Sequence, residues 1–200
     1  MTTRLQAVLA RTPLLLILMR FLIAAVLLMD AVDRQLSPAF VALFVFAVFS
    51  DYLDGYICRK IKMSSVQLSA LDGYADATLY LSVGFCLWLV YPDVVDKYQG
   101  LLSLLLCFQV VSWLFSLIRF GRITSYHTYR AKIWGVMLCL AIVEVLVRGS
   151  GILTPLMALA GGICIAEDMV ITTIMPYWKT GVLNIQTAYR LRQAHKAAVG

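Results

Sequence analysis

One stretch organises this chain: Asp51–Asp76, which reads DYLDGYICRKIKMSSVQLSALDGYAD. It holds four aspartates, Asp51, Asp54, Asp72 and Asp76, and long apolar runs lie on both sides of it. The first two aspartates are three residues apart and the last two are four apart, so on helices each pair lies on one face. Acidic residues within apolar helices are costly, and they are typical of functional sites that face the inside of a helix bundle.

Four carboxylates that converge repel one another unless protons or cations hold them. Ligation by oxygen atoms alone suits a hard divalent ion such as Mg²⁺ or Mn²⁺. We therefore expect the four aspartates to form a metal site at the cytoplasmic mouth of a helical membrane protein.

The composition is that of a membrane protein. The chain has 200 residues, of which 62% are hydrophobic, and its mean hydropathy is +0.85. These values lie outside the range of soluble domains, and the length suits one membrane domain over residues 1–200. The net charge of +6 is explained by loop cations beside anionic lipids, so we expect no nucleic-acid partner.

Apolar runs predict an all-α, integral membrane bundle of six transmembrane helices within residues 13–176. The spans are expected at about 14–29, 38–57, 67–90, 98–118, 133–147 and 152–175. Residues 1–12 have the spacing of an amphipathic helix that lies on the membrane surface, and Pro13 would begin the first span. Residues 177–200 form a cytoplasmic basic tail whose apolar positions suggest another interfacial helix.

The distribution of cations predicts the orientation. In this topology one side of the membrane carries fourteen of the seventeen lysines and arginines, and the other carries the remaining three, Arg34, Lys97 and Arg148. Because cytoplasmic loops are rich in Lys and Arg, both termini should lie inside. The second and third spans, joined by a short loop, should be antiparallel neighbours, so the two aspartate pairs should meet just below the cytoplasmic surface.

The spacing of these residues resembles the signature of the CDP-alcohol phosphotransferase family, D-x2-D-G-x2-A-R-x8-G-x3-D-x3-D. All four aspartates, Gly55 and Arg59 match it, whereas Cys58 and Leu68 stand where the signature has alanine and glycine. Near the N-terminus, Thr12-Pro13 and Arg20 are similar to the opening T-P-N-x2-T-x2-R of the family.

The resemblance implies transfer of a phosphatidyl group from CDP-diacylglycerol to a small polar alcohol, with release of CMP. It implies two divalent ions, Mg²⁺ or Mn²⁺, held by Asp51, Asp54, Asp72 and Asp76. Asp76 would also be the catalytic base that takes the proton of the acceptor hydroxyl. The nucleotide-binding residues would be Asp51, Asp54, Gly55 and Arg59.

The loop after the fourth span contains several cations and resembles the place where family members bind a phosphorylated acceptor. We single out Arg122 and Lys132 as acceptor-binding candidates and leave Arg130 aside. The resemblance also implies a homodimer. We further expect membrane lipids as surroundings and a bacterial inner membrane, with the active site facing the cytoplasm as the cation distribution predicts.

Three alternatives remain open at the level of sequence. The donor could be CDP-choline or CDP-ethanolamine with diacylglycerol as acceptor. The intramembrane aspartates could instead serve a metal-ion transporter. Leu68, a bulky residue at a glycine position, also leaves room for an inactive homologue.

Two further predictions concern structure rather than chemistry. Glu144, Glu167 and Asp168 are intramembrane acids, and we expect Glu167 or Asp168 to pair with a loop cation. No cysteine spacing is typical of zinc binding, so we expect five packed thiols and no disulfide. The cysteines are Cys58, Cys86, Cys107, Cys139 and Cys164.

Overall fold

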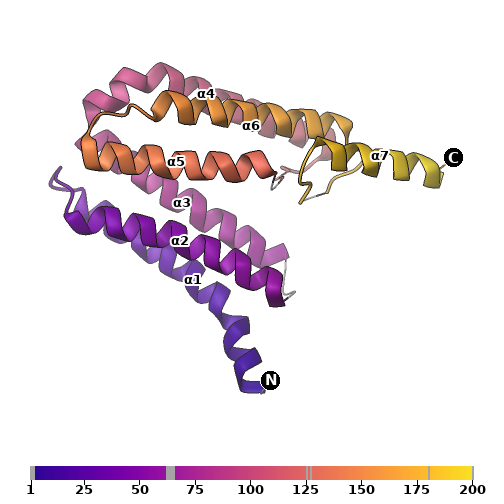
Figure 1. The fold of residues 1–200 in the computed structure, drawn as a ribbon, viewed down its shortest axis with the longest axis horizontal. Coiled ribbons are helices and arrows are strands. Elements are labelled where there is room, and N and C mark those ends of the chain that lie inside the picture. The colour runs from indigo at the N-terminus through magenta and orange to yellow at the C-terminus, as the bar shows by residue number, and fades with distance from the viewer. Residues whose placement is uncertain (1–2, 62–65, 125, 127, 180, 200) are drawn as a thin grey trace. The chain divides into compact units, whose positions relative to one another are not determined.

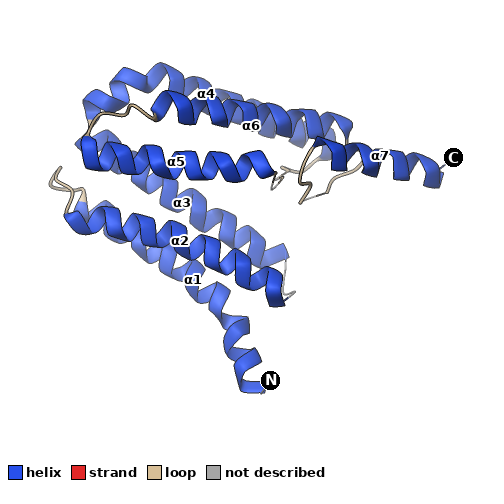
Figure 2. Cartoon of the chain, viewed as in Figure 1, coloured by secondary structure: helices blue, strands red, loops and turns tan. Residues whose placement is uncertain are grey.

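The structure is a computed structural model. It describes the backbone of residues 3–61, 66–124, 126, 128–179 and 181–199, and the side chains of residues 14–50, 71, 73–124, 126, 128–179 and 181–197. Every regular element in these ranges is a helix, and none is a strand (Figure 2). The predicted all-α class is therefore confirmed for the described part of the chain. Two compact units follow one another, Met1–Val95 and Asp96–Gly200.

The N-terminal unit contains three helices, α1 (Thr3–Asp30), α2 (Pro38–Ile61) and α3 (Val66–Val90) (Figure 1). Helix α1 packs against both α2 and α3. Phe44 of α2 and Tyr80 of α3 also meet edge to face, with ring centroids 6.3 Å apart. The core side chains are fully or almost fully buried, and the largest of them are Ile17, Leu27, Phe40, Phe44, Leu79 and Val83.

The boundary predicted at Pro13 is wrong, because α1 continues through this residue from Thr3 to Asp30. Proline lacks the N–H that would bond the carbonyl four residues earlier, and it usually ends or bends a helix in water. Membrane helices tolerate proline better, since neighbouring groups and local adjustment satisfy the freed carbonyl. Residues 3–12 are thus the first turns of α1, and their predicted position on the membrane surface remains a prediction.

The C-terminal unit contains most of α4 (Pro92–Phe120) and all of α5 (Tyr129–Arg148), α6 (Thr154–Ile174) and α7 (Ile185–Val199). Helix α5 packs against α6, and α7 packs against α6. Helix α4 starts six residues earlier than predicted, because Pro92 suits a first helical position. Thr128 caps the start of α5, where its hydroxyl accepts a hydrogen bond from the Ala131 amide at 3.1 Å.

Helix α6 approaches two neighbours closely at Gly161. A Cβ atom added to this glycine would lie 2.6 Å from Trp134 Nε1 of α5 and 3.1 Å from Leu105 Cδ1 of α4. A side chain at this position would therefore overlap the Trp134 ring and would be in tight contact with Leu105. The adjacent Gly162 has open space around the same atom. Because Gly161 has no side chain, the Trp134 ring can lie directly against the backbone of α6. Small residues serve close helix packing in membranes in the same way.

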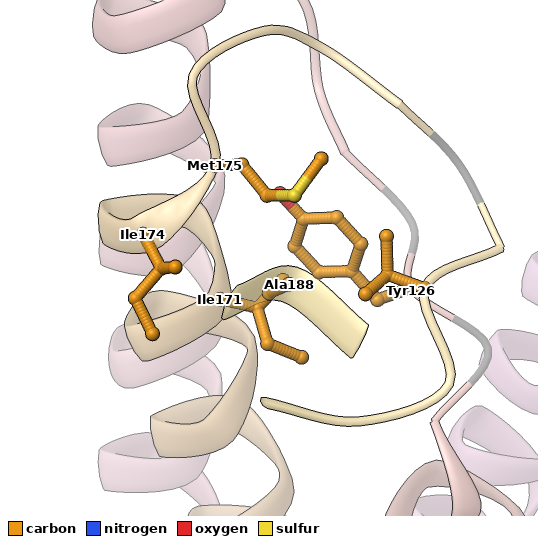
Figure 3. Close-up of a cluster of buried hydrophobic side chains, with 6 residues drawn as sticks. Tyr126, Ile171, Ile174, Met175 and Ala188 are labelled. Carbon is orange, nitrogen blue, oxygen red and sulfur yellow. The ribbon is translucent and has the colours of Figure 1, made fainter. Parts of the chain in front are cut away.

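The tail helix α7 is held by an apolar cluster at the end of α6. Tyr126, Ile171, Ile174, Met175, Val182 and Ala188 form its buried part (Figure 3). Phe120, Ile185 and Leu191 pack against them. The helix expected in the basic tail is confirmed, and its first turns dock on the unit by burying apolar surface.

Large apolar side chains also cover the outside of the helices. Leu15, Leu22 and Met29 of α1 and Ile118 of α4 are among the exposed ones. Exposed apolar surface on this scale is typical of contact with lipid. Three described helical segments are long and apolar enough to cross a membrane, Gly73–Val90, Pro92–Phe120 and Thr154–Ile174, and Pro38–Ser50 is a shorter apolar one. Helices stand at all six predicted places, whereas the count of six spans remains a prediction.

Candidate functional site

The predicted site residues lie on two consecutive helices. Asp51, Asp54, Gly55 and Arg59 fall in the last turns of α2, and Asp72 and Asp76 fall in the first turns of α3. The helical assignment supports the premise that each aspartate pair shares a face. Of these six side chains only Asp76 belongs to the described ones. The meeting of the two aspartate pairs, and the nucleotide-binding roles of Gly55 and Arg59, therefore remain predictions.

Asp76 forms an ion pair with Arg20 of α1. The Nη1 atom of Arg20 donates a hydrogen bond to Oδ1 of Asp76, so the pair joins two helices across 56 residues of sequence. The Arg20 side chain is completely buried, whereas the Asp76 side chain is 33% exposed. The cation therefore lies inside the unit, and the carboxylate lies toward its surface.

Sequence reasoning counted Arg20 among the cytoplasmic cations and assigned it no role in the site. The structure corrects this point, because a completely buried arginine contributes nothing to the charge of a loop. A signal was present in the sequence. Arg20 is the one ionisable residue in the apolar run 14–29, and such a residue almost always pairs with another inside the bundle.

Only part of the donor set for a divalent ion falls within the described side chains. Among these side chains no group of three or more His, Cys, Asp or Glu residues is arranged to hold a metal. Three of the four predicted ligands, Asp51, Asp54 and Asp72, lie outside them. The chemistry of the full set, four carboxylates at helical spacing with Asp76 partly exposed, fits an oxygen-ligated ion such as Mg²⁺ or Mn²⁺.

The two acceptor-binding candidates are exposed cations that each lie beside an aromatic ring. The Arg122 guanidinium lies 5.3 Å from the centroid of the Trp178 ring, and the Lys132 amine lies 5.5 Å from that of Tyr129. Trp178 is itself fixed by its indole N–H, which donates to the Ile123 carbonyl at 3.3 Å. These contacts orient both cations weakly and leave them accessible to an anionic ligand.

Other charged residues of the C-terminal unit have structural partners. Arg119 donates to the carbonyls of Thr173 and Met175, at 2.9 and 3.2 Å, and so satisfies the C-terminal end of α6. Arg130 lies 3.7 Å from Glu167, with an Arg side chain that is 53% exposed and a Glu side chain that is 5% exposed. The prediction that Glu167 or Asp168 pairs with a cation is thus confirmed for Glu167, but the cation lies in the first turn of α5 and not in a loop.

Three remaining features lie outside the predicted site. Ser150 donates a hydrogen bond to Glu144 at the far end of α5. An apolar groove of about 360 Å³ lies between α4 and α6, and its lining includes Leu101, Leu104, Phe108, Val111, Ala158 and Gly162. The four cysteines with described side chains are free thiols. Cys86 and Cys164 are buried, as predicted for packed thiols, Cys139 is half-buried, and Cys107 is exposed, which corrects the prediction at that position.

Comparison with known proteins gives one match. A family model described as CDP-alcohol phosphatidyltransferase matches residues 10–181, which is most of the chain and includes every helix from α2 to α6. No match to the chain was found among curated proteins or among solved structures.

Proposed function

The chain belongs to the CDP-alcohol phosphatidyltransferase family, and from this membership we propose that it transfers a phosphatidyl group from CDP-diacylglycerol to a small polar alcohol and releases CMP. The family makes it a membrane transferase of phospholipid synthesis. A phosphorylated alcohol is the first candidate for the acceptor. The observation that carries the proposal is the aspartate signature on α2 and α3, whose last member, Asp76, is partly exposed in the described structure.

The proposed reaction balances as a single displacement at phosphorus. The acceptor hydroxyl oxygen forms a bond to the phosphorus of the phosphatidyl group. The bond from that phosphorus to the bridging oxygen breaks, and CMP leaves with the bonding electrons on its phosphate. The proton of the acceptor hydroxyl passes to the carboxylate of Asp76, which acts as the general base.

The proposed metal ligands are Asp51, Asp54, Asp72 and Asp76. When bound, two divalent ions supply the positive charge that holds a diphosphate and stabilises a leaving oxygen. Asp51, Asp54, Gly55 and Arg59 would bind the cytidine diphosphate, since the planar guanidinium of arginine suits phosphate oxygens. Support for this assignment comes from the spacing of these residues in two consecutive helices.

Arg122 and Lys132 are the proposed contacts for a phosphate on the acceptor. Both are exposed, and both belong to the segment that joins α4 to α5 or to the first turn of α5. Charge-assisted hydrogen bonds from two cations to one phosphate favour a phosphorylated alcohol over a neutral one. The cation distribution supports a site that faces the cytoplasm, in a membrane that we propose to be the bacterial inner membrane, and the family resemblance supports a homodimer.

The test is a matched comparison of donors with the purified full-length protein in lipid nanodiscs. CDP-diacylglycerol is offered with a panel of alcohols, and CDP-choline or CDP-ethanolamine is offered with diacylglycerol, each with Mg²⁺ or Mn²⁺. We expect CMP release only with CDP-diacylglycerol, and most rapidly with a phosphorylated alcohol. CMP release only from CDP-choline or CDP-ethanolamine would reverse the assignment of donor and acceptor.

The same preparation separates the remaining alternatives. Uptake of Mn²⁺ into liposomes without CMP release would support a transporter. No turnover of any donor, followed by turnover after Leu68→Gly, would support an inactive homologue.

A further inference from the structure

We infer that Arg20 is the positioning residue for the catalytic base: its guanidinium holds Oδ1 of Asp76 from inside the N-terminal unit and so fixes how the carboxylate faces the acceptor. The inference rests on the proposed function, which gives Asp76 its role. It adds a residue from α1, a helix outside the aspartate signature, to the machinery of the reaction.

The Arg20 end of the pair is enclosed by the unit, whereas the Asp76 end is partly exposed. Arg20 is completely buried and is one of the largest buried side chains of the protein. It lies on α1, the helix that packs against both aspartate-bearing helices. Asp76 receives its hydrogen bond on Oδ1 while a third of its side chain stays exposed.

A fixed partner matters because an aspartate carboxylate turns easily. The terminal torsion of aspartate is broad, so a partly exposed carboxylate samples many orientations unless a hydrogen bond selects one. Arginine suits this task, since its guanidinium is planar, stays charged and presents donors in a rigid fork. A base must lie within hydrogen-bond reach of the proton it takes, and small errors in position reduce the rate.

The burial pattern argues against a role in packing alone. Bringing a charged arginine into the interior is costly, and an apolar residue of similar volume often stabilises a fold equally well or better. Where this protein uses an ion pair between helices for structure, at Arg130 and Glu167, the cation is half-exposed and the acid is buried. The Arg20–Asp76 pair has the opposite arrangement, which presents the acid to the outside of its unit.

The first test separates turnover from binding in the full-length enzyme. We expect Arg20→Met, which fills the space without the charge, to lower kcat by about 100-fold and to leave the KM for CDP-diacylglycerol within about threefold. Arg20→Lys keeps the charge but not the fork, so its kcat should fall by only about tenfold. Arg130→Met removes the guanidinium of the other pair and serves as the matched control, with kcat unchanged.

The second test asks whether a guanidinium in the empty site restores the rate. Arg20→Ala should lose turnover, and millimolar methylguanidinium should raise its kcat by at least about tenfold if the missing group acts on Asp76. The same compound should leave Arg20→Met unchanged, because the methionine fills the space.

The third readout needs no turnover. In the metal-free protein, the melting temperature of the double variant Arg20→Met/Asp76→Asn should fall by less than the sum of the two single shifts, because the residues interact. Additive shifts would show that the pair does not form, and would overturn the inference.

A wild-type kcat for Arg20→Met, in protein that is folded at the assay temperature, would overturn the inference and leave the proposed function standing. Absence of turnover by the wild-type protein with every donor would overturn the proposed function, and the positioning role with it. Loss of kcat in both Arg20→Met and Arg130→Met, in proportion to their loss of folded protein, would make both pairs structural and would also overturn the inference.

Discussion

In the N-terminal unit the buried partner of the ion pair is the cation, whereas in the C-terminal unit it is the acid. Arg20 is completely buried and its partner Asp76 is 33% exposed, while Glu167 is 5% exposed and its partner Arg130 is 53% exposed. Both pairs join two helices of one unit, and both contain an arginine and a carboxylate. The pairs differ in which partner is buried, the arginine in the first and the carboxylate in the second.

The difference separates an acid that is accessible from outside its unit from an acid that is enclosed. The Asp76 carboxylate is partly exposed and accepts a hydrogen bond from the buried Arg20, so a metal ion or a substrate could reach it. A carboxylate that is enclosed by its own unit and covered by an arginine is neutralised in place. Under the proposed function, the Arg20–Asp76 pair serves the reaction, and the Arg130–Glu167 pair serves the contact between α5 and α6.

The largest expected effect comes from replacing the two acids in parallel. Asp76→Asn should lower kcat by about 10³-fold or more, because an amide cannot accept the acceptor proton. The same result is expected for Asn at Asp51, Asp54 or Asp72 if they hold the metal. Glu167→Gln should leave kcat within about twofold, since its carboxylate is enclosed.

CMP release by each variant, normalised to folded protein after size-exclusion chromatography in detergent, measures this effect. A wild-type rate for Asp76→Asn would remove it from the mechanism. A comparable loss of kcat in Glu167→Gln would end the distinction between the two pairs.

The next effect is on stability and sharpens the account of the C-terminal pair. Arg130→Met leaves the Glu167 carboxylate buried without its cation, which should cost about 2 to 3 kcal/mol of unfolding free energy. Glu167→Gln leaves a half-exposed arginine that water solvates, so it should cost less than about 1 kcal/mol. Thermal unfolding in detergent measures both, and equal losses would contradict the burial pattern.

A smaller loss of stability is expected at the contact of α6 with its neighbours. Gly161→Ala adds a methyl group that overlaps Trp134 Nε1, so neighbouring side chains must move, at about 1 to 2 kcal/mol. Gly162→Ala is the matched control, because its added carbon meets open space. The melting temperature should fall for the first variant only, and kcat of folded protein should change in neither. A lower kcat after Gly161→Ala would mean that the C-terminal unit takes a direct part in the chemistry.

The smallest expected effect concerns binding of the acceptor. Lys132→Ala should raise the KM for a phosphorylated alcohol by about threefold to tenfold, since an exposed cation contributes about 1 kcal/mol to an anion contact. The KM for CDP-diacylglycerol should stay unchanged and serves as the internal control. An unchanged KM for the acceptor would argue for a neutral alcohol.

The helices and the structural ion pair could be predicted from sequence because they follow from local patterns. Apolar runs interrupted by charged residues, proline or glycine predicted the helical places. An acid inside such a run predicted that Glu167 or Asp168 pairs with a loop cation, but not that the partner is Arg130. Helix boundaries were less predictable. Pro13 predicts a helix start, yet α1 continues through it from Thr3 to Asp30.

The site was only partly predictable for a physical reason. The spacing of the aspartates fixes which residues share a helix face, but the partner of Asp76 comes from a helix 56 residues away. The apolar run around Arg20 indicates that this residue pairs with another polar group, but it does not identify Asp76 as the partner. The hydrogen bonds of Arg119 to the end of α6 likewise depend on tertiary structure. Their acceptors are backbone carbonyl groups, which every residue has, so the sequence does not indicate which of them Arg119 will bind.

The separation of Arg20 from Asp76 has a consequence for biosynthesis. When α1 leaves the ribosome, the helix that carries its counter-charge has not yet been made. Placing an arginine at the centre of a membrane helix costs about 2.5 to 3.5 kcal/mol during insertion by the translocon. In the predicted six-span topology, the Arg20–Asp76 ion pair can therefore form only after α3 has been made, so that the first three helices would complete their packing together.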